Sequence, residues 1–521
     1  MAAPVEAPAI AFDPRGSLFS PPCRVETHEG VQVLLDPDRA HWISVNEPGL
    51  RLLQEADGKT GTELIEAAGH EPGSKGERRV LRFLKQAEKR GFLSNEPFVP
   101  TDYTGRAPRL KPARLHEFWV LTNDDCNLRC RHCYTIDRVI KGDKGLPGET
   151  LRAIIDEARD LGAEVFYFTG GEPFRRDDIF ELVEFVASRS KLIIFTNGTM
   201  IDDEVAQRLA PWAERLIFQI SLDGDGEDNT VKVRGRTAFD RAYVGIQCLL
   251  RAGLRVGVSS TPTGAAYQSI PDLTERLARL EVGGRRVEFH HLIMLLDQGG
   301  AAQNDDDMGI GYEQFSQVLQ DCRGRIQRVK REDKGCRLVI ANDKMFKALA
   351  SHGPRKDLCG AGYTILGMTA DGFLNPCAAT INDAKYQCGR LLETDGSYRP
   401  GRLTHLWWND PQLERIRRYT LARRAGESTQ DLRFFHGGGC WYNMSDPESA
   451  FSEAHPFAQV YEDFTLQEIL KLAVKGVDEI SSEAPELYNF MHRQRIACAG
   501  ERKVEEVGEG GVDNGYCICF A

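Results

Sequence analysis

The sequence of 521 residues predicts an α/β protein built around a partial, open (β/α)6 barrel. From residue 117 onward, apolar runs of strand length alternate six times with runs of helical periodicity, which is the pattern of a parallel sheet with covering helices. A short segment of strands and helices precedes this region, and a loop-rich, cysteine-bearing segment follows it. A chain of this length exceeds one ordinary hydrophobic core, so we expect several domains.

Composition and charge narrow the class of protein. Hydrophobic residues make up 41% of the chain and charged residues 27%, as in globular proteins. The formal net charge of −11 gives no sign of a nucleic-acid partner or a membrane partner. No apolar stretch approaches the length of a membrane-spanning helix, and residues 1–21 lack the pattern of a signal peptide. We therefore expect a cytoplasmic protein whose 14 cysteines serve metal or redox chemistry.

Shifts in composition predict the domain organisation. Residues 1–21 are rich in alanine and proline and are expected to form a disordered arm. The other segments are a compact domain at 22–96, a linker at 97–115, the barrel at 116–300, a helical connector at 301–356, a loop-rich domain at 357–445, a helical region at 446–499 and an acidic, glycine-rich tail at 500–521.

Each element of the first two domains has its own local signal. In the compact domain, Val31–Leu35 and 40–45 flank a turn and predict two strands, and three amphipathic runs at 47–55, 60–68 and 75–90 predict helices. The expected barrel strands are 117–122, 164–169, 191–196, 215–222, 254–261 and 286–294. Reactive groups of such a barrel lie at the C-terminal ends of its strands.

A loop of three cysteines follows the first barrel strand. Cys126, Cys130 and Cys133 have the spacing C-x3-C-x2-C. Three thiolates can hold three irons of a cubic [4Fe–4S] cluster and leave the fourth iron open to a small molecule. A structural zinc site would need four ligands and usually a C-x2-C pair, and His132 as the fourth ligand would be crowded by its neighbours. A disulfide would need an oxidising compartment.

With His132 as the aromatic-type residue before the last cysteine, this loop resembles that of radical S-adenosylmethionine enzymes. The resemblance implies that the open iron and His132 contact S-adenosylmethionine. It also implies that an electron from the cluster cleaves this molecule, and that the resulting 5′-deoxyadenosyl radical abstracts a hydrogen from the substrate. A reductant protein such as flavodoxin or ferredoxin would supply the electron.

The second strand ends in a glycine motif, Gly170-Gly171-Glu172-Pro173. Glycines allow close approach of the backbone to a ligand, and a carboxylate can accept hydrogen bonds from an ammonium group. A glycine turn that merely ends the strand is the alternative. The family resemblance implies that Gly170, Gly171 and Glu172 hold the methionyl amino group.

The third strand ends in Thr196-Asn-Gly-Thr199 and the fourth in Ser221-Leu-Asp223-Gly224. Strand alternation would place Ser221 and Asp223 on one face, where they can bind ribose hydroxyls or cap the next helix. The resemblance implies the ribose contact, and it implies that Arg234 contacts the methionyl carboxylate, although a surface arginine is the alternative. The four motifs span about 117–294 in the family's order.

Later cysteines resemble those of the SPASM/twitch extension, which carries auxiliary iron–sulfur clusters. Cys359 and Cys377 match its opening, and His436-Gly-Gly-Gly-Cys440 matches its end. The resemblance implies one auxiliary cluster held by Cys359, Cys377 and Cys440, with Cys388 or an open iron at the fourth position. Buried, unligated cysteines are the alternative. The places of three other family cysteines hold Glu427, Gln430 and His436.

The remaining cysteines carry weaker signals. Cys498, Cys517 and Cys519 can bind metal, reach the active site, resolve a disulfide or have no role. Ordinary core or surface positions are expected for Cys23, Cys248, Cys322 and Cys336.

Residues 22–96 resemble the PqqD-like recognition domain, or RRE, of pathways that modify ribosomally made peptides. The matching features are the strand pair ending in Trp42-Ile-Ser-Val-Asn46 and the three helices that follow. A short sheet with an exposed edge can accept an extended peptide as an added strand. A winged-helix DNA-binding module is the alternative, against which the acidic balance and the lack of a basic recognition helix argue.

The three domains together resemble peptide maturases. We expect an enzyme that binds the leader of a precursor peptide on residues 22–96 and forms a thioether or carbon–carbon crosslink in its core. Alternatives are a peptide epimerase, an oxidative decarboxylase or an enzyme of small-molecule cofactor biosynthesis. A non-catalytic iron–sulfur chaperone is disfavoured by the intact motifs. The sequence assigns no catalytic base. In the sulfatase-maturing branch an acid follows the second extension cysteine, and Ala378 at that place argues against the chemistry of that branch.

Overall fold

The computed structural model describes residues 12–38, 41–99, 112, 114–341 and 360–418, with isolated positions 432, 462–463, 465–467, 469–470 and 473. Most of the expected linker and helical region, and all of the acidic tail, lie outside these residues. So do Cys359, Cys440, Cys498, Cys517 and Cys519.

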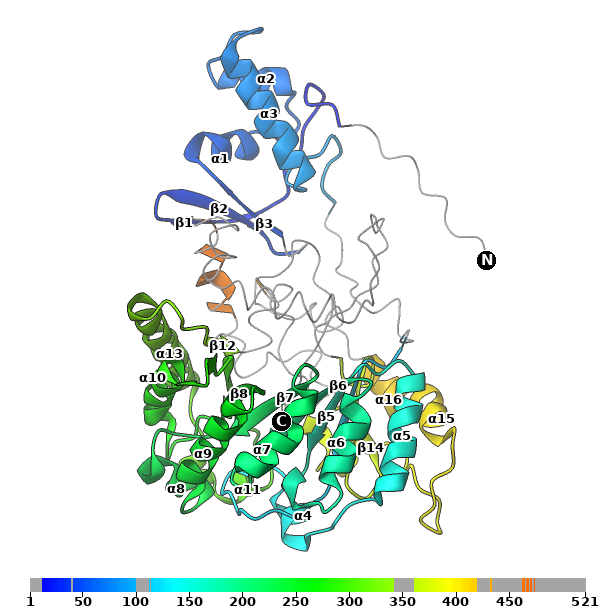
Figure 1. The fold of residues 1–521 in the computed structure, drawn as a ribbon. Coiled ribbons are helices and arrows are strands. Elements are labelled where there is room, and N and C mark those ends of the chain that lie inside the picture. The colour runs from blue at the N-terminus through cyan, green and yellow to red at the C-terminus, as the bar shows by residue number, and fades with distance from the viewer. Residues whose placement is uncertain are drawn as a thin grey trace.

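The N-terminal unit contains a three-stranded antiparallel sheet and three helices (Figure 1). Its elements are β1 (Arg24–His28), β2 (Val31–Asp36), β3 (His41–Val45), α1 (Glu47–Gln54), α2 (Gly61–Ala67) and α3 (Lys75–Lys89). The sequence predicted all of these except β1, whose charged and polar residues alternate with few apolar ones. The disordered arm expected over residues 1–21 does not extend to residue 17. Residues 17–19 form isolated β-bridges within this unit, and Leu18 is fully buried in it.

The sheet of the N-terminal unit is apolar on both faces. Leu34 and Ile43 pack with the helices, as strand alternation requires. Val33, Leu35 and Trp42 face the other way and form a second apolar cluster with residues far along the chain. The members from that distant segment are Leu432, Leu466, Ile469, Leu470 and Ala473.

The barrel region is a parallel sheet of six predicted strands. They are β4 (Glu117–Leu121), β5 (Val165–Thr169), β6 (Lys191–Thr196), β7 (Leu216–Ser221), β8 (Arg255–Ser260) and β11 (Phe289–Leu292). Neighbours in this order pair in parallel, which confirms the predicted α/β class. Along β4, Phe118 and Val120 face the covering helices, whereas Trp119 and Leu121 face the barrel interior.

Helices cover the outer face of this sheet (Figure 1). They are α5 (Gly148–Asp160), α6 (Ile179–Ala187), α7 (Asp203–Leu209), α9 (Ala238–Arg251) and α10 (Ile270–Arg279), whereas α4 (Ile136–Lys141) and α8 (Glu227–Arg234) lie at the lower end of the barrel region in Figure 1. The short strands β9 (Glu281–Val282) and β10 (Arg285–Arg286) form a hairpin, and the short helices α11 (Gly300–Gln303) and α12 (Asp305–Met308) follow β11.

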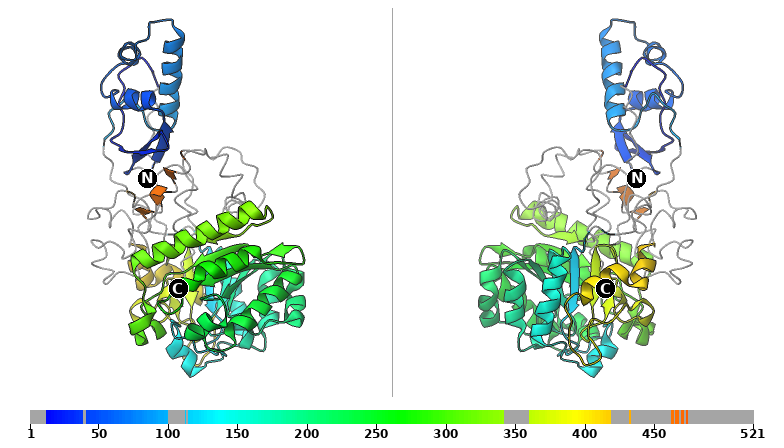
Figure 2. Two further views of the ribbon diagram at one scale, coloured as in Figure 1. Left: turned by 90° about the vertical axis from the view of Figure 1, so that its left-hand side faces the viewer. Right: turned by 90° about the vertical axis from the view of Figure 1, so that its right-hand side faces the viewer.

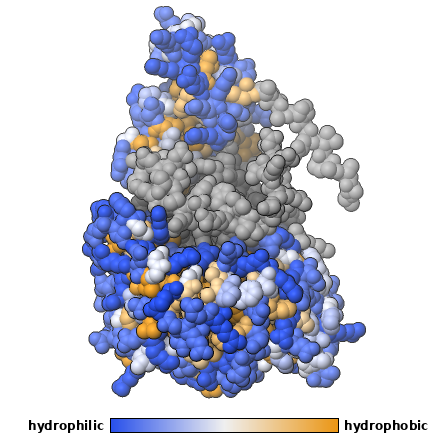
Figure 3. Space-filling model, in the orientation of Figure 1, coloured by the Kyte–Doolittle hydropathy of each residue, from blue (hydrophilic) through white to orange (hydrophobic). Residues whose placement is uncertain are grey.

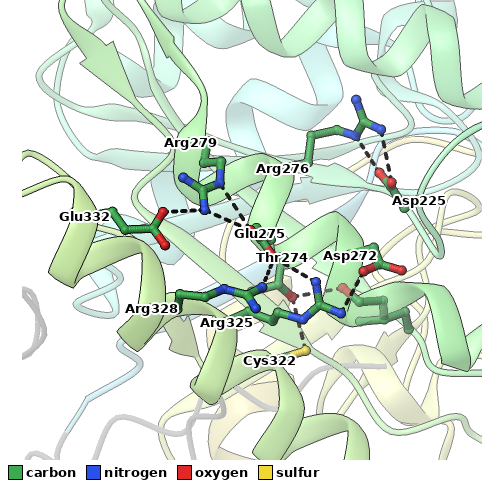
Figure 4. Close-up of polar contacts among 11 residues, drawn as sticks. Asp225, Asp272, Thr274, Glu275, Arg276, Arg279, Cys322, Arg325, Arg328 and Glu332 are labelled. Atoms are coloured by element: carbon green, nitrogen blue, oxygen red, sulfur yellow. Dashed lines mark hydrogen bonds and ion pairs between the residues drawn. The ribbon is translucent and has the colours of Figure 1, made fainter.

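A long helix, α13 (Tyr312–Glu332), runs along the edge of the barrel region that faces the N-terminal unit (Figure 2). It packs against α10, and a group of charged side chains joins the two helices (Figure 4). Glu275 of α10 accepts hydrogen bonds from Arg325 and Arg328 of α13, and from Arg279. Arg279 also pairs with Glu332 at 2.7 Å.

The segment after residue 360 extends the same sheet. The strand β13 (Ile365–Met368) pairs in parallel with β4, and β14 (Leu374–Asn375) turns back against it. At the other edge, β12 (Val339–Ala341) pairs with β11. Two helices follow, α15 (Arg402–Asn409) and α16 (Pro411–Arg417). The sequence predicted a helical connector at 301–356, where β12 lies, and a loop-rich segment from residue 357 on, so these added strands were not expected.

The face of the molecule shown in Figure 3 is mostly hydrophilic where its residues are described. Figure 3 shows polar side chains over most of the visible barrel helices and the N-terminal unit, with scattered apolar ones between them. The large apolar side chains exposed among the described residues are Val25, Val99, Ile140, Val244 and Trp408. Of the helices that the structure describes, none is both long and apolar enough to span a membrane.

Candidate active site

A pocket lies at the C-terminal ends of the barrel strands, where the sequence predicted reactive groups. The cysteine loop after β4, the glycine motif after β5 and the end of β7 all contribute to its wall. Of the residues proposed from the sequence, those that line it are Cys126, Cys130, His132, Cys133, Gly170, Gly171, Ser221 and Arg234. Glu172 and Asp223 are fully buried and are not among its lining residues.

The three thiols of the cysteine loop have polar neighbours from different elements. Asn197 Nδ2 lies 3.9 Å from Cys126 Sγ, and Arg234 Nη1 lies 3.8 Å from Cys130 Sγ. Thr135 Oγ1 lies 3.4 Å from Cys133 Sγ. Burial raises the pKa of the Cys126 thiol to about 11 and that of Cys130 to about 12.

The donor set of this loop fits an iron–sulfur cluster better than a single ion. Among the described residues, no three side chains of His, Cys, Asp or Glu are grouped closely enough to hold one metal ion. A cubic cluster places each cysteine at a separate corner, so its ligands need not converge on one point. Three thiols around one pocket therefore suit a cluster with an open iron.

The glycine motif allows the backbone before the cysteine loop to pack closely against the end of β5. Gly170 has a φ of +131°, and a Cβ there would lie 2.2 Å from the carbonyl oxygen of Asn123. A Cβ on Gly171 would lie 2.3 Å from the carbonyl oxygen of Asp125. The N–H groups of Gly171 and Glu172 donate to these two carbonyl groups at 2.8 Å each. A side chain at either glycine would therefore collide with the chain's own backbone, and both glycines also line the pocket.

The carboxylate of Glu172 accepts its hydrogen bonds from groups within the protein. Its oxygens accept hydrogen bonds from Thr196 Oγ1 at 2.6 Å, the Asn197 N–H at 2.8 Å and the Phe174 N–H at 3.2 Å. Burial raises the pKa of Glu172 above its usual range, although these hydrogen bonds oppose the shift. The structure therefore links the glycine motif to the end of β6.

The motif Thr196–Thr199 connects β6 to the cysteine loop. The Asn197 side chain donates to Asn127 Oδ1 at 2.9 Å, and Asn127 Nδ2 donates to Thr199 Oγ1 at 2.8 Å. Thr199 Oγ1 returns a hydrogen bond to Asn197 Oδ1 at 2.7 Å. This closed set of hydrogen bonds fixes the loop on the side of Cys126, a role that the sequence did not assign to these residues.

Asp223 lies between Arg234 and His132. Its Oδ2 is 2.5 Å from Arg234 Nε and 3.2 Å from His132 Nε2, and its Oδ1 accepts the Thr261 N–H at 2.7 Å. Burial opposes ionisation of Asp223, but Arg234, His132 and the Thr261 N–H outweigh it and hold the pKa below its usual value. Burial lowers the pKa of His132 to about 4.

Aromatic side chains fill the barrel interior beside the pocket. The rings of Trp119 and Tyr167 are stacked with centroids 3.9 Å apart, and Phe195 lies 5.2 Å from Trp119. Trp119 and Phe195 also line the pocket. Sequence reasoning did not single them out, although each occupies an inward position of its strand. Ala378 from the extension lines the same pocket, so the extension closes part of it.

The structure separates the two described cysteines of the extension. Cys377 is 2% exposed and packs in the apolar cluster of the barrel interior, next to Ala378. Cys388 is 7% exposed and packs in the cluster on the other side of the sheet. Elsewhere, Cys248, Cys322 and Cys336 are buried, and Cys23 is partly buried.

Comparisons with known proteins identify the family. A model of the Radical SAM superfamily matches residues 120–278. The chain is 36% identical over 322 residues to mycofactocin maturase MftC of Mycobacterium tuberculosis, covering 59% of this chain and 74% of that protein. It is 31% identical over 301 residues to the AdoMet-dependent heme synthase of Nitratidesulfovibrio vulgaris, covering 53% of this chain and 76% of that protein. For another relative, the alignment spans only 52% of its length.

A solved structure has the same fold. The structure of anSMEcpe with bound AdoMet matches with a TM-score of 0.52 at 16% identity, covering 69% of this chain and 99% of that chain. The parallel sheet with its covering helices and this likeness define the α/β fold class. The chain belongs to the radical SAM superfamily, and it is a radical S-adenosylmethionine enzyme. This family implies a [4Fe–4S] cluster and S-adenosylmethionine as cofactors.

Proposed function

We propose that this enzyme modifies a ribosomally synthesised precursor peptide, with a leader bound by residues 22–96 and a crosslink formed in the core peptide. The observation that carries the proposal is the combination of a pocket with three loop thiols and a separate three-stranded sheet whose edge strands are β1 and β3. The crosslink is a thioether or a carbon–carbon bond. The similarity to a protein named as a maturase supports this assignment.

In this proposal the cysteine loop ligates the cluster through Cys126, Cys130 and Cys133. S-adenosylmethionine fills the adjoining pocket, where Gly170, Gly171, Ser221, Arg234 and His132 are placed to contact it. When bound, the two cofactors supply hydrogen abstraction by a 5′-deoxyadenosyl radical. The apolar wall formed by Trp119 and Phe195 keeps water from this region and gives a substrate side chain a surface to pack on.

The N-terminal unit is proposed to be PqqD-like. In its sheet the order is β1-β2-β3, so β1 and β3 are the edge strands. A leader peptide can extend such a sheet through backbone hydrogen bonds, with side-chain pockets giving specificity. Three helices follow the sheet, as in the PqqD-like domain that this unit resembles. In this proposal residues 22–96 deliver the core peptide to the pocket.

An auxiliary iron–sulfur cluster is proposed for the SPASM/twitch-like extension, with Cys359, Cys377 and Cys440 as ligands. The burial of Cys377 beside the pocket-lining Ala378 supports a cluster close to the substrate. The packing of Cys388 in a different apolar cluster makes it a weaker fourth ligand than an open iron.

A second candidate function is synthesis of a tetrapyrrole or another small cofactor. The similarity to an AdoMet-dependent heme synthase over 76% of that protein favours it. A peptide epimerase and a peptide decarboxylase also fit the same core. A reductant such as flavodoxin or ferredoxin would serve any of these reactions.

The proposed function is tested with candidate precursor peptides encoded beside the gene. The anaerobically reconstituted protein is incubated with S-adenosylmethionine, reductant and peptide, and the products are analysed by mass spectrometry. Crosslinking removes two hydrogens from the peptide. An epimerase would instead leave the mass unchanged in water and incorporate deuterium in heavy water, and a decarboxylase would release carbon dioxide. Turnover of a porphyrin with no change in any peptide would contradict the proposal.

The cluster assignment is tested by Cys126→Ala. Loss of one ligand from a three-cysteine site should abolish cleavage of S-adenosylmethionine to 5′-deoxyadenosine, measured by liquid chromatography. The control is Cys23→Ala, which removes a thiol of the N-terminal unit and should leave cleavage at the wild-type rate.

The auxiliary cluster is tested by Cys359→Ala. We expect this variant to cleave S-adenosylmethionine normally, because the barrel thiols are intact, but to form no crosslinked peptide and to contain fewer irons per chain. Full product formation would remove the case for an auxiliary cluster.

A further inference from the structure

Ser221 is the last residue of β7 and Asp223 lies two residues beyond it, and the two side chains have different surroundings. Ser221 lines the pocket, whereas Asp223 is fully buried and is absent from the described pocket wall. Both oxygens of the Asp223 carboxylate are engaged by the protein itself. Oδ1 accepts the Thr261 N–H, and Oδ2 faces Arg234 and His132. Little of the carboxylate is left for a ribose hydroxyl.

The two side chains that contact Asp223 Oδ2 both line the pocket. Arg234 is the last residue of α8, and His132 belongs to the cysteine loop. The side chain of Arg234 is only 11% exposed, so its charge would be buried and unpaired without Asp223. The ion pair also restricts a long side chain that would otherwise have several rotamers.

The contact with His132 sets its tautomer. A carboxylate 3.2 Å from Nε2 favours the proton on that nitrogen. Nδ1 is then an acceptor, and it is buried with no hydrogen-bond partner among the described residues. A buried acceptor without a partner is costly, so the contact between Asp223 and Nε2 is the polar contact that holds this ring in place among the described residues.

We propose that Asp223 is a positioning residue, which holds Arg234 and His132 at the pocket for S-adenosylmethionine and does not itself contact the ribose. This inference rests on the proposed site and replaces the ribose contact expected from the sequence. It assigns the ribose contact at this strand end to Ser221 alone.

The test is a double-mutant cycle on binding. Dissociation constants for S-adenosylmethionine are measured by anaerobic calorimetry on the cluster-reconstituted full-length protein and on Asp223→Asn, Arg234→Gln and the double variant. We expect Asp223→Asn to weaken binding about 10-fold to 100-fold, as for other supporting residues of cofactor sites. In the Arg234→Gln background, Asp223→Asn should weaken binding little further, because the two substitutions remove one shared interaction. Independent, additive effects would overturn the inference.

Ribose analogues separate positioning from direct contact. The same variants are titrated with analogues of S-adenosylmethionine that lack the 2′- or the 3′-hydroxyl group. The penalty of Asp223→Asn should be the same for all three ligands. The matched control is Ser221→Ala, whose penalty should shrink with the analogue that lacks the contacted hydroxyl. A penalty of Asp223→Asn that disappears with either analogue would overturn the inference.

Iron content and the electron paramagnetic resonance spectrum of each variant establish that its cluster is intact. If Asp223→Asn loses the cluster, Asp223→Glu takes its place in both experiments, because it keeps the charge and displaces it by one methylene. Failure of the wild-type protein to bind S-adenosylmethionine would overturn the proposed function together with this inference. Dependence of the penalty on a ribose hydroxyl would overturn the inference alone.

Discussion

The thiols of the cysteine loop differ in the side chains that approach them. Cys130 has the cationic Arg234 nearby, Cys126 has the neutral amide of Asn197, and Cys133 has the hydroxyl of Thr135. Hydrogen-bond donors near cluster sulfur atoms stabilise the reduced, more negative state. The corner of the cluster at Cys130 would therefore be the most strongly stabilised in the reduced form.

Replacement of Asn197 should expose this effect. In Asn197→Ala the contact with Cys126 and the hydrogen bond to Asn127 are both lost. We expect a lower reduction potential, so that a given reductant reduces less of the cluster and cleavage of S-adenosylmethionine is slower by about 10-fold. The potential is measured by a redox titration followed by electron paramagnetic resonance. Asn229→Ala, on α8, is the control, because Asn229 bonds only to backbone and side chains of its own segment in the described contacts. An unchanged potential in Asn197→Ala would contradict the prediction.

Individual side chains also show how far the sequence could predict the site. The cysteine loop, the glycines, Ser221 and Arg234 do line one pocket, because parallel strands end at one edge of a sheet. The placement of Asp223 could not be predicted by strand alternation, since β7 ends at Ser221 and the two-residue period ends with it. Glu172 likewise follows β5, and its partners come from β6.

At the scale of elements, α10 and α13 are joined by buried apolar residues and by the charged group around Glu275. Hydrogen bonds from Arg325, Arg279 and Arg328 outweigh the effect of burial and lower the pKa of Glu275 to about 2, from 4.5. A carboxylate with a lowered pKa stabilises the folded state fully above about pH 4.5 and loses this contribution as the pH falls toward 2.

Glu275→Gln should therefore destabilise the contact between α10 and α13 in a pH-dependent way. We expect a loss of about 1 kcal/mol at pH 7, because three arginines lose a common partner near the surface. The difference from wild type should shrink between pH 4.5 and pH 2, where the wild-type carboxylate becomes protonated. Thermal unfolding of the metal-free protein across this range measures it. Glu332→Gln is the control, since its half-exposed carboxylate pairs with Arg279 alone in the described contacts. A difference that stays constant down to pH 2 would count against this explanation.

The extension is attached to the barrel by elements that the sequence did not reveal. Glu157 of α5 accepts the N–H groups of Gly401 and Thr404 at the start of α15. Arg138 of α4 pairs with Asp371 at 2.6 Å. The parallel pairing of β13 with β4 joins segments far apart in the chain, and such pairing leaves no local pattern. The six barrel strands were predictable because their apolar runs alternate regularly with helical runs, whereas β13 has four residues and β14 two, with no helix between them.

At the scale of the whole molecule, the segment around 462–473 links the N-terminal unit to the barrel region. Ile469 is fully buried in the cluster with Val33, Leu35 and Trp42. Asp463 accepts a hydrogen bond from Tyr312 of α13 at 2.6 Å. No pattern in either segment predicts this contact, because any apolar face can cover the sheet and the sequence does not show which one does.

Ile469→Asp should detach the N-terminal unit from this segment. A carboxylate in an apolar cluster without a partner costs several kcal/mol unless the contact opens. We expect faster hydrogen exchange in β2 and β3, unchanged cleavage of S-adenosylmethionine without peptide, and loss of crosslinked product. Gln467→Asp is the matched control, because it places the same carboxylate at an exposed position of the same segment. Protection of β2 equal to that of the wild type would contradict the proposed link.

The contact between Ile469 and the N-terminal sheet has a consequence during synthesis of the chain on the ribosome. Val33, Leu35 and Trp42 leave the ribosome early, whereas Ile469 is made near the other end of the chain. At ordinary rates of translation this interval is on the order of a minute. Throughout that time the nascent N-terminal sheet presents an uncovered apolar face, which favours aggregation. We therefore expect slow codons before residue 469 to lengthen this exposure and to increase aggregation of the nascent chain.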